Sequence, residues 1–157
     1  MRQERIAITL ATFLLALVPN LHASRCSNAT GAGRWEFTVT GTVILPTGAP
    51  IPVAQVGTYT QDKWGNLVGS QTRSLGGSVA EEAFTGTVST NPDCTAKATI
   101  AVTDNASGAV VRTSTLEVVF IEDGRQARSL VTTLVLPSGA SLGPVLTIEH
   151  RRLFVAF

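Results

Sequence analysis

One short motif in the sequence has the form of a catalytic element. Residues 139–143 match the pattern G-x-S-x-G, in which Ser141 would be the nucleophile, and Glu149 and His150 follow further along the chain. In α/β-hydrolases this motif needs a sharp turn from a parallel strand into a helix. Here Ser141 lies in a predicted loop between strands, and adjacent residues of a strand point to opposite faces. The sequence therefore predicts no catalytic set around Ser141.

Residues that could bind a metal ion are sparse. The chain has 2 histidines, and His150 is the one beyond the N-terminal segment. Zinc sites usually combine several His or Cys ligands. The acidic pairs at 81–82 and 122–123 lack the alternating spacing of a calcium-binding loop. We therefore expect no metal and no cofactor, and we expect His150 to be a half-buried strand residue.

Glu117 is the carboxylate whose position most strongly suggests a role. It lies in a predicted strand that carries apolar residues on both faces. If it pointed into a barrel it would need a partner such as Arg112 or Arg128, or its pKa would rise. Glu117 is therefore a candidate cavity carboxylate, able to anchor a ligand or to act as an acid or base. The alternative is an outward or structurally paired side chain.

The elements that would position these residues are strands. Polar and apolar residues alternate with a period of two, which is typical of half-buried strands. The pattern predicts eight strands, at residues 34–45, 51–60, 67–75, 83–90, 95–103, 109–122, 126–136 and 145–155.

The connections between these strands are mostly short. Asp123-Gly124 favours a type I′ hairpin, whereas Gly76-Gly77 is interpreted as the start of a linker in which residues 78–83 are a weak helix candidate. Short turns favour pairing between sequence neighbours, and an eight-stranded meander tends to close so that no edge is exposed. The predicted fold is an all-β, antiparallel up-and-down barrel, whose interior holds side chains or one small ligand. A two-sheet β-sandwich is the alternative.

Composition limits the function. The chain has 157 residues, a formal net charge of +1, 15% charged residues and 44% hydrophobic residues. That length predicts a single domain. A protein that binds nucleic acid through phosphates needs clustered Lys and Arg, so we expect no nucleic-acid partner.

The N-terminus has the pattern of a secretory signal peptide. Arg2 and Arg5 precede an apolar run at residues 6–18, and a small residue, Ala23, stands at the expected cleavage site. The apolar run is shorter than the ~20 residues that a membrane-spanning helix needs. We predict a signal peptide at 1–23 and a secreted or periplasmic domain at 24–157, with no membrane span after cleavage. An uncleaved N-terminal anchor is the alternative.

Export gives the 2 cysteines a structural meaning. Oxidising compartments allow disulfides to persist, and both Cys26 and Cys94 follow the predicted signal peptide. We predict a disulfide between them that ties the start of the domain to its middle.

Gly33, Arg34 and Trp35 at the start of the first predicted strand form a G-x-W triplet. The triplet resembles that of the calycin superfamily, which includes lipocalins, fatty-acid-binding proteins and avidins. The resemblance implies that Trp35 closes the barrel floor beside an arginine of the last strand, for which Arg151 and Arg152 are both available. An arginine stacked on an indole ring is a favourable cation–π contact.

A broader resemblance covers most of the predicted domain. Residues 26–30, 64–66 and 91–95 together resemble segments of small secreted proteins of environmental bacteria, whose barrels are lipocalin-like or allene oxide cyclase-like. This resemblance implies a barrel fold and export. The closed meander and the lack of a catalytic set predict a secreted, non-enzymatic barrel that binds a small apolar ligand or serves an extracellular role. Two alternatives stay open: a barrel enzyme of the isomerase or cyclase kind, and an extracellular interaction module without a ligand cavity.

Overall fold

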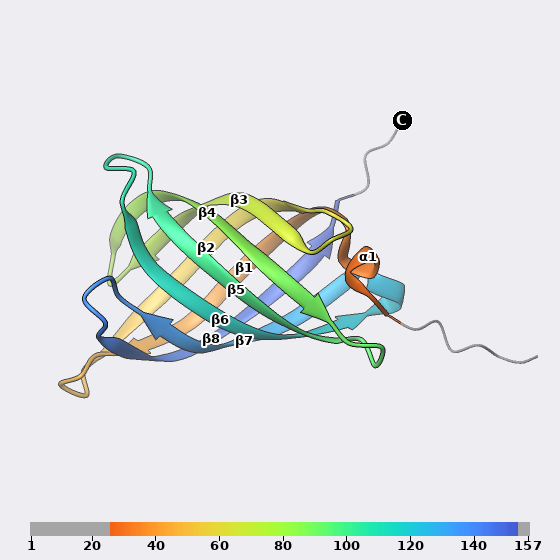
Figure 1. Ribbon diagram of the computed structural model, residues 1–157. Helices are drawn as coiled ribbons and strands as arrows, with labels where there is room; N and C mark the ends of the chain where they lie inside the picture. Colours follow the sequence, from red (N-terminus) through yellow and green to blue (C-terminus); the bar gives the residue numbers. More distant parts are fainter. Residues whose placement is uncertain (1–25, 154–157) are drawn as a thin grey trace, which may run out of the picture.

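The computed structural model describes residues 26–153 and folds them into a closed barrel of eight antiparallel strands (Figure 1). Each strand pairs with its sequence neighbours, and β8 pairs with β1 to close the barrel. The strands are β1 (Gly33–Ile44), β2 (Pro50–Gln61), β3 (Asn66–Leu75), β4 (Ser78–Thr90), β5 (Thr95–Asp104), β6 (Val110–Ile121), β7 (Gln126–Val135) and β8 (Ser141–Arg152). The predicted up-and-down barrel is confirmed, and the closed sheet excludes the β-sandwich. The predicted signal peptide lies outside the described residues.

Three local predictions differ from the structure. Gly76 and Gly77 form a tight turn with φ values of 57° and 90°, so residues 78–83 belong to β4 and are neither linker nor helix. The last strand starts at Ser141, which places that residue in β8 and not in a loop. The hairpin at Asp123-Gly124 is longer than a two-residue turn, because it includes the 3₁₀ turn η1 (Glu122–Gly124).

The alternation of polar and apolar residues reflects the two faces of each strand, as expected. In β1, Trp35, Phe37 and Val39 are buried inside the barrel, while Glu36 and Thr38 between them are exposed. Successive strand residues point to opposite faces, so the apolar half of each strand forms the interior.

Inward-facing glycines allow the sheet to curve tightly around large aromatic side chains. A Cβ atom on Gly57 would lie 2.3 Å from the carbonyl oxygen of Ser70 and 2.7 Å from Cζ of Phe37. One on Gly69 would lie 2.5 Å from Cζ of Phe84. Any larger residue at these positions would push apart either the neighbouring strand or the aromatic rings of the interior.

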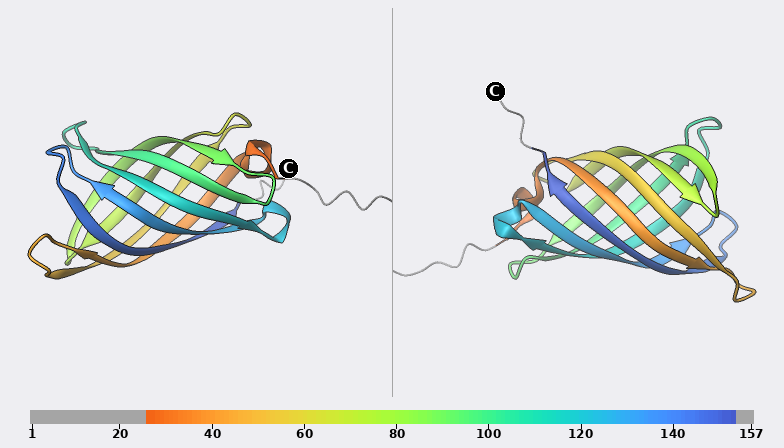
Figure 2. Two further views of the ribbon diagram at one scale, coloured as in Figure 1. Left: turned by 60° about the horizontal axis from the view of Figure 1, so that its bottom comes forward. Right: turned by 180° about the vertical axis from the view of Figure 1, so that it is seen from behind.

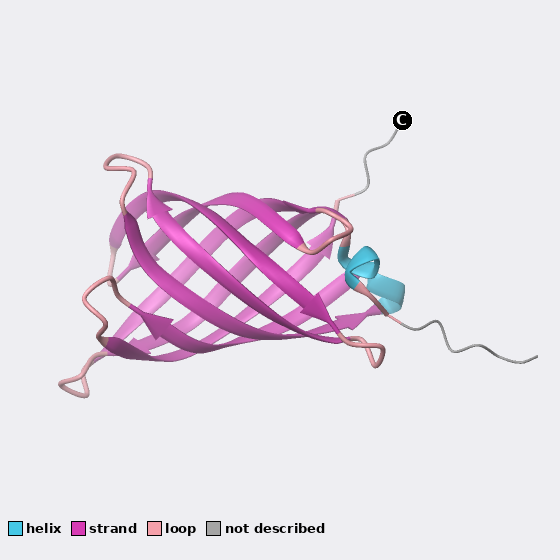
Figure 3. Ribbon diagram, in the orientation of Figure 1, coloured by secondary structure: helices cyan, strands magenta, loops and turns pink. Residues whose placement is uncertain are grey.

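The two ends of the barrel differ. The short helix α1 (Asn28–Gly31) lies across one end, as all views show (Figures 1 and 2). At the other end lie only the turns that join β1 to β2, β3 to β4, β5 to β6 and β7 to β8 (Figure 3). Within residues 26–153, no helix is long and apolar enough to cross a membrane. We call the end with α1 the floor and the opposite end the mouth.

Candidate functional site

The interior of the barrel contains a cavity of about 300 Å³. Its walls are mainly apolar side chains from every strand, among them Val39, Val53, Phe84, Ala98, Leu116, Val131 and Leu146. Because inward positions of several strands carry small residues, side chains do not fill the barrel completely. A few polar groups interrupt the apolar wall, and they lie in separate groups along the barrel.

Trp35 and Arg152 form the floor of the barrel. Trp35 is fully buried, and its indole Nε1–H donates a hydrogen bond of 2.8 Å to the carbonyl oxygen of Gly31 in α1. The Arg152 guanidinium carbon lies 5.0 Å from the centroid of the indole ring, and its Nη2 donates to the carbonyl oxygen of Thr30. Arg151 is exposed on the outer face, so Arg152 is the arginine that stands beside Trp35.

Asn28 and the disulfide hold α1 against the barrel. The Asn28 side chain accepts a 2.8 Å hydrogen bond from the backbone N–H of Thr90, and donates one of 2.8 Å to the carbonyl oxygen of Trp64. The predicted disulfide between Cys26 and Cys94 is present. These contacts close the floor of the barrel.

His150 faces the lower part of the cavity, together with the polar residues Tyr59 and Gln61. Its Nδ1 lies 3.3 Å from the Tyr59 hydroxyl and its Nε2 lies 2.7 Å from Oγ of Ser129. Burial, together with the nearby positive charge of Arg128, lowers the pKa of His150 to about 4, so the imidazole is neutral at neutral pH. Ser129 does not itself line the cavity, so this pair offers no accessible nucleophile.

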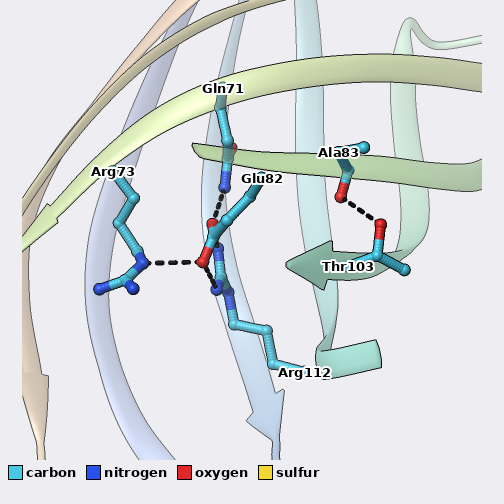
Figure 4. A network of polar contacts seen from close by, with 6 residues as sticks. All are labelled: Gln71, Arg73, Glu82, Ala83, Thr103 and Arg112. Atoms are coloured by element: carbon cyan, nitrogen blue, oxygen red, sulfur yellow. Dashed lines mark hydrogen bonds and ion pairs between the residues drawn. The ribbon is translucent and has the colours of Figure 1, made fainter. Parts of the chain in front are cut away.

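A charged network occupies the mouth, with Glu82 at its centre (Figure 4). The Glu82 side chain is only 2% exposed. Its carboxylate accepts hydrogen bonds of 2.7 Å from Gln71, 2.8 Å from Nε of Arg73, and 2.8 and 2.6 Å from the two terminal nitrogens of Arg112. One buried carboxylate therefore binds two guanidiniums.

These partners fix the charge of Glu82. Burial alone would raise its pKa, but the hydrogen bonds and charge of Arg112, with those of Gln71 and Arg73, outweigh burial and lower the pKa to about 2. Glu82 is thus ionised at neutral pH and its oxygens are saturated. Its chemistry is to position the two arginines, because a carboxylate held in this way is a poor acid or base.

Of the two alternatives for Glu117, the structure shows the outward, paired side chain and not the cavity carboxylate. This side chain is 53% exposed on the outer face of β6 and forms an ion pair of 3.1 Å with Lys97, so it does not line the cavity. Glu149 also points outward, where it pairs with Arg128, while its neighbour His150 points inward. The separation of Glu149 and His150 onto opposite faces is as expected, and Ser141 lies exposed at the mouth end of β8.

The sequence interpretation missed Glu82, Arg73 and Arg112 as one cluster. Glu82 falls in the predicted linker, because Gly76 and Gly77 favour a turn and the residues between them and Glu82 show no alternation of polar and apolar types. Extending the alternation backwards from the buried Phe84 and Val88 would have placed Glu82 on the inner face of the same strand.

The arrangement of His, Cys, Asp and Glu side chains indicates whether a metal ion could bind. Among residues 26–153, no three His, Cys, Asp or Glu side chains are grouped closely enough to hold a metal ion.

The fold and the interior together define the architecture of the protein. It is a small up-and-down barrel with a sealed floor, a charged mouth and an apolar cavity. This architecture is consistent with a lipocalin-like barrel. No protein-family model and no curated protein matches the chain.

Proposed function

We propose that the protein binds a small, mainly apolar molecule inside its barrel. The observation that carries this proposal is the cavity of about 300 Å³, with mainly apolar walls and a sealed floor. Small-molecule sites are typically concave and mostly apolar, have a few placed polar groups, and start at volumes of roughly 300 Å³. His150 and the network around Glu82 supply such polar groups at two depths.

The alternatives receive less support. An interaction module that uses only its outer face has no need of a hollow interior, and a solid core would be the more stable arrangement. The isomerase or cyclase alternative rests on the resemblance to cyclase-like barrels and on an inward Glu117, and Glu117 lies on the outer face. Glu82 does face inward, but its carboxylate is committed to two arginines.

We also propose that the protein is exported. The predicted signal peptide at 1–23 and the disulfide between Cys26 and Cys94 both support this. Intact mass measured on protein from its own host is expected to show a chain that begins near Ser24 and that does not react with an alkylating agent before reduction. A full-length chain with two alkylated thiols would contradict export.

Native mass spectrometry of the protein purified from its own host tests ligand binding. We expect an added mass that is lost on denaturation, from a molecule retained in the cavity. Stripped protein should also gain thermal stability with some members of a panel of lipids and aromatic compounds, because a ligand that binds only the folded state stabilises it. Ligand-free protein that shows no thermal shift across the panel would contradict the proposal.

A further inference from the structure

We infer that the ligand is an amphipathic molecule with a carboxylate head group, which binds Arg73 at the mouth while its apolar body fills the cavity. This inference rests on the proposed function and adds to it the chemical class of the ligand.

The first observation is an unused donor on Arg73. Its Nε donates to Glu82, but its Nη1 is buried and has no hydrogen-bond partner. Among residues 26–153, two other side chains hold a buried polar atom without a partner, Thr90 and Arg152, and both lie outside the cavity lining. Arg73 lines the cavity. Buried donors in folded proteins are usually paired, so among the described residues Arg73 is the cavity-lining side chain with a buried donor left over.

The second observation is that the neighbours of Arg73 are already occupied. The two oxygens of Glu82 also accept hydrogen bonds from Gln71 and from both terminal nitrogens of Arg112. One carboxylate thus serves two guanidiniums and leaves Arg73 short of an acceptor.

Asp104 is the other acidic residue that lines the cavity, and it does not fill this role. It stands opposite Glu82 in the pairing of β4 with β5. Its Oδ1 accepts hydrogen bonds of 2.8 Å from both the backbone N–H and the hydroxyl of Ser107. The ion pairs among the described residues include none between Asp104 and an arginine. Asp104 therefore holds the turn after β5 in place, and Arg73 stays available.

The third observation is the position of this donor above an apolar chamber. A guanidinium forms its strongest hydrogen bonds with carboxylates and phosphates, and a cavity of about 300 Å³ has room for one small ligand. A carboxylate head would pair with Arg73 and an apolar chain would lie against residues such as Phe84 and Leu146. A wholly apolar ligand would cover the unpaired nitrogen without providing an acceptor.

Calorimetric titration with three ten-carbon probes separates the contribution of the head from that of the chain. The probes are decanoate, methyl decanoate and 1-decanol, tested on the unaltered protein, on Arg73→Met and on the control variant Arg151→Met. Arg151 is exposed on the outer face of β8 and does not line the cavity. We expect decanoate to bind most tightly and Arg73→Met to weaken it by roughly tenfold to a hundredfold, the effect of one charged hydrogen bond. Binding of 1-decanol should not change, and Arg151→Met should leave all three affinities unaltered.

The outcomes distinguish this inference from the proposed function. If the unaltered protein binds the ester, or both the ester and the alcohol, as tightly as the acid, the inference of a carboxylate head group is wrong. The proposal of apolar ligand binding would still stand. A loss of affinity in Arg73→Met that is the same for acid and alcohol would also overturn the carboxylate head group. Failure of all three probes to bind the unaltered protein would overturn both proposals. If Arg73→Met does not fold, Arg73→Lys, which keeps the charge but loses the planar fork, should bind decanoate more weakly and 1-decanol normally.

Discussion

Glu82 holds both arginines of the mouth, so the stability of this end of the barrel depends on one carboxylate. The side chains of Arg73 and Arg112 are 18% and 13% exposed. Cations buried to this extent are costly without a counterion. The network is thus a structural requirement of the mouth as well as a candidate part of the binding site.

Glu82→Gln should therefore destabilise the fold. It keeps the shape of the side chain but leaves two guanidiniums without their counterion, and we expect the free energy of unfolding at neutral pH to fall by about 3 kcal/mol. Urea unfolding measures this change. Glu117→Gln is the matched control, because Glu117 and Lys97 are more than half exposed and exposed pairs contribute less than about 1 kcal/mol. Equal losses in the two variants would contradict the role of Glu82.

The same carboxylate should make stability depend on pH. The pKa of Glu82 is lowered from 4.5 to about 2 in the folded protein, so the unfolded chain takes up the proton first as the pH falls. The stabilisation is complete above about pH 4.5 and is lost as the pH falls toward 2. Urea unfolding across this interval should show a shallower decline for Glu82→Gln than for the unaltered protein. Parallel declines would contradict the lowered pKa.

His150 should stay neutral well below its ordinary pKa. Its pKa falls from 6.5 to about 4 because burial and the charge of Arg128 disfavour the imidazolium. The unfolded chain binds a proton near pH 6.5, so the stabilisation by neutral His150 is present above that pH and is lost as the pH falls toward 4. In an NMR titration the ring resonances of His150 should not move between pH 8 and about 5. A midpoint near 6.5 would contradict a buried imidazole.

At the scale of single residues, the sequence predicts the contacts of some side chains and not those of others. Cys26 and Cys94 could be paired because no other cysteine competes. The sequence does not show on which face of β6 Glu117 lies. Val119 on the outer face is apolar although it is 47% exposed, so both faces of this strand have apolar residues. The partners of Glu82 come from β3 and β6, and only the register of the closed sheet brings them together.

Among the elements, α1 and the disulfide act together as the plug of the floor. The cysteines are separated by 68 residues in sequence, and their Cα atoms lie 4.9 Å apart. Cross-linking two distant positions stabilises mainly by restricting the unfolded chain. The hydrogen bonds of Asn28 add a second attachment that does not depend on redox state.

Replacing both cysteines, Cys26→Ser with Cys94→Ser, should lower the free energy of unfolding by about 2–4 kcal/mol. The strand content seen by far-UV circular dichroism should not change, since the eight strands pair without help from the disulfide. Thermal and urea unfolding measure the loss. A variant as stable as the parent, or one without strand content, would contradict this division between plug and barrel.

The alternation of polar and apolar residues predicts all eight strands, but it does not predict where some of them begin. β4 begins five residues earlier than predicted and β8 four residues earlier. In β4 the exposed Val79 and the buried Glu82 reverse the expected alternation, and Gly143 and Pro144 interrupt the alternation in β8. At these ends the neighbouring strands and not the local sequence determine the conformation.

For the whole molecule, the sequence predicts that the sheet closes into a barrel, but it does not determine whether the barrel contains a cavity. Short turns between neighbouring strands favour a meander, yet tilt and register decide whether the sheet closes, and the pairing of β8 with β1 settles this. The cavity depends on which inward side chains meet across the barrel. Gly57 lies against the large ring of Phe37 on the neighbouring strand, and that combination has no signature in a single strand.

Ligand binding in the interior is the central claim, and a pair of variants on one strand tests it most directly. Ala98 points into the cavity and is 4% exposed, whereas its neighbour Thr99 is exposed on the outer face. Ala98→Phe should fill part of the cavity, and Thr99→Phe places the same ring outside. In calorimetric titration with 1-decanol, we expect binding by the unaltered protein and by Thr99→Phe, and loss of binding by Ala98→Phe. Equal binding by the two variants, or none by the unaltered protein, would contradict a ligand site inside the barrel.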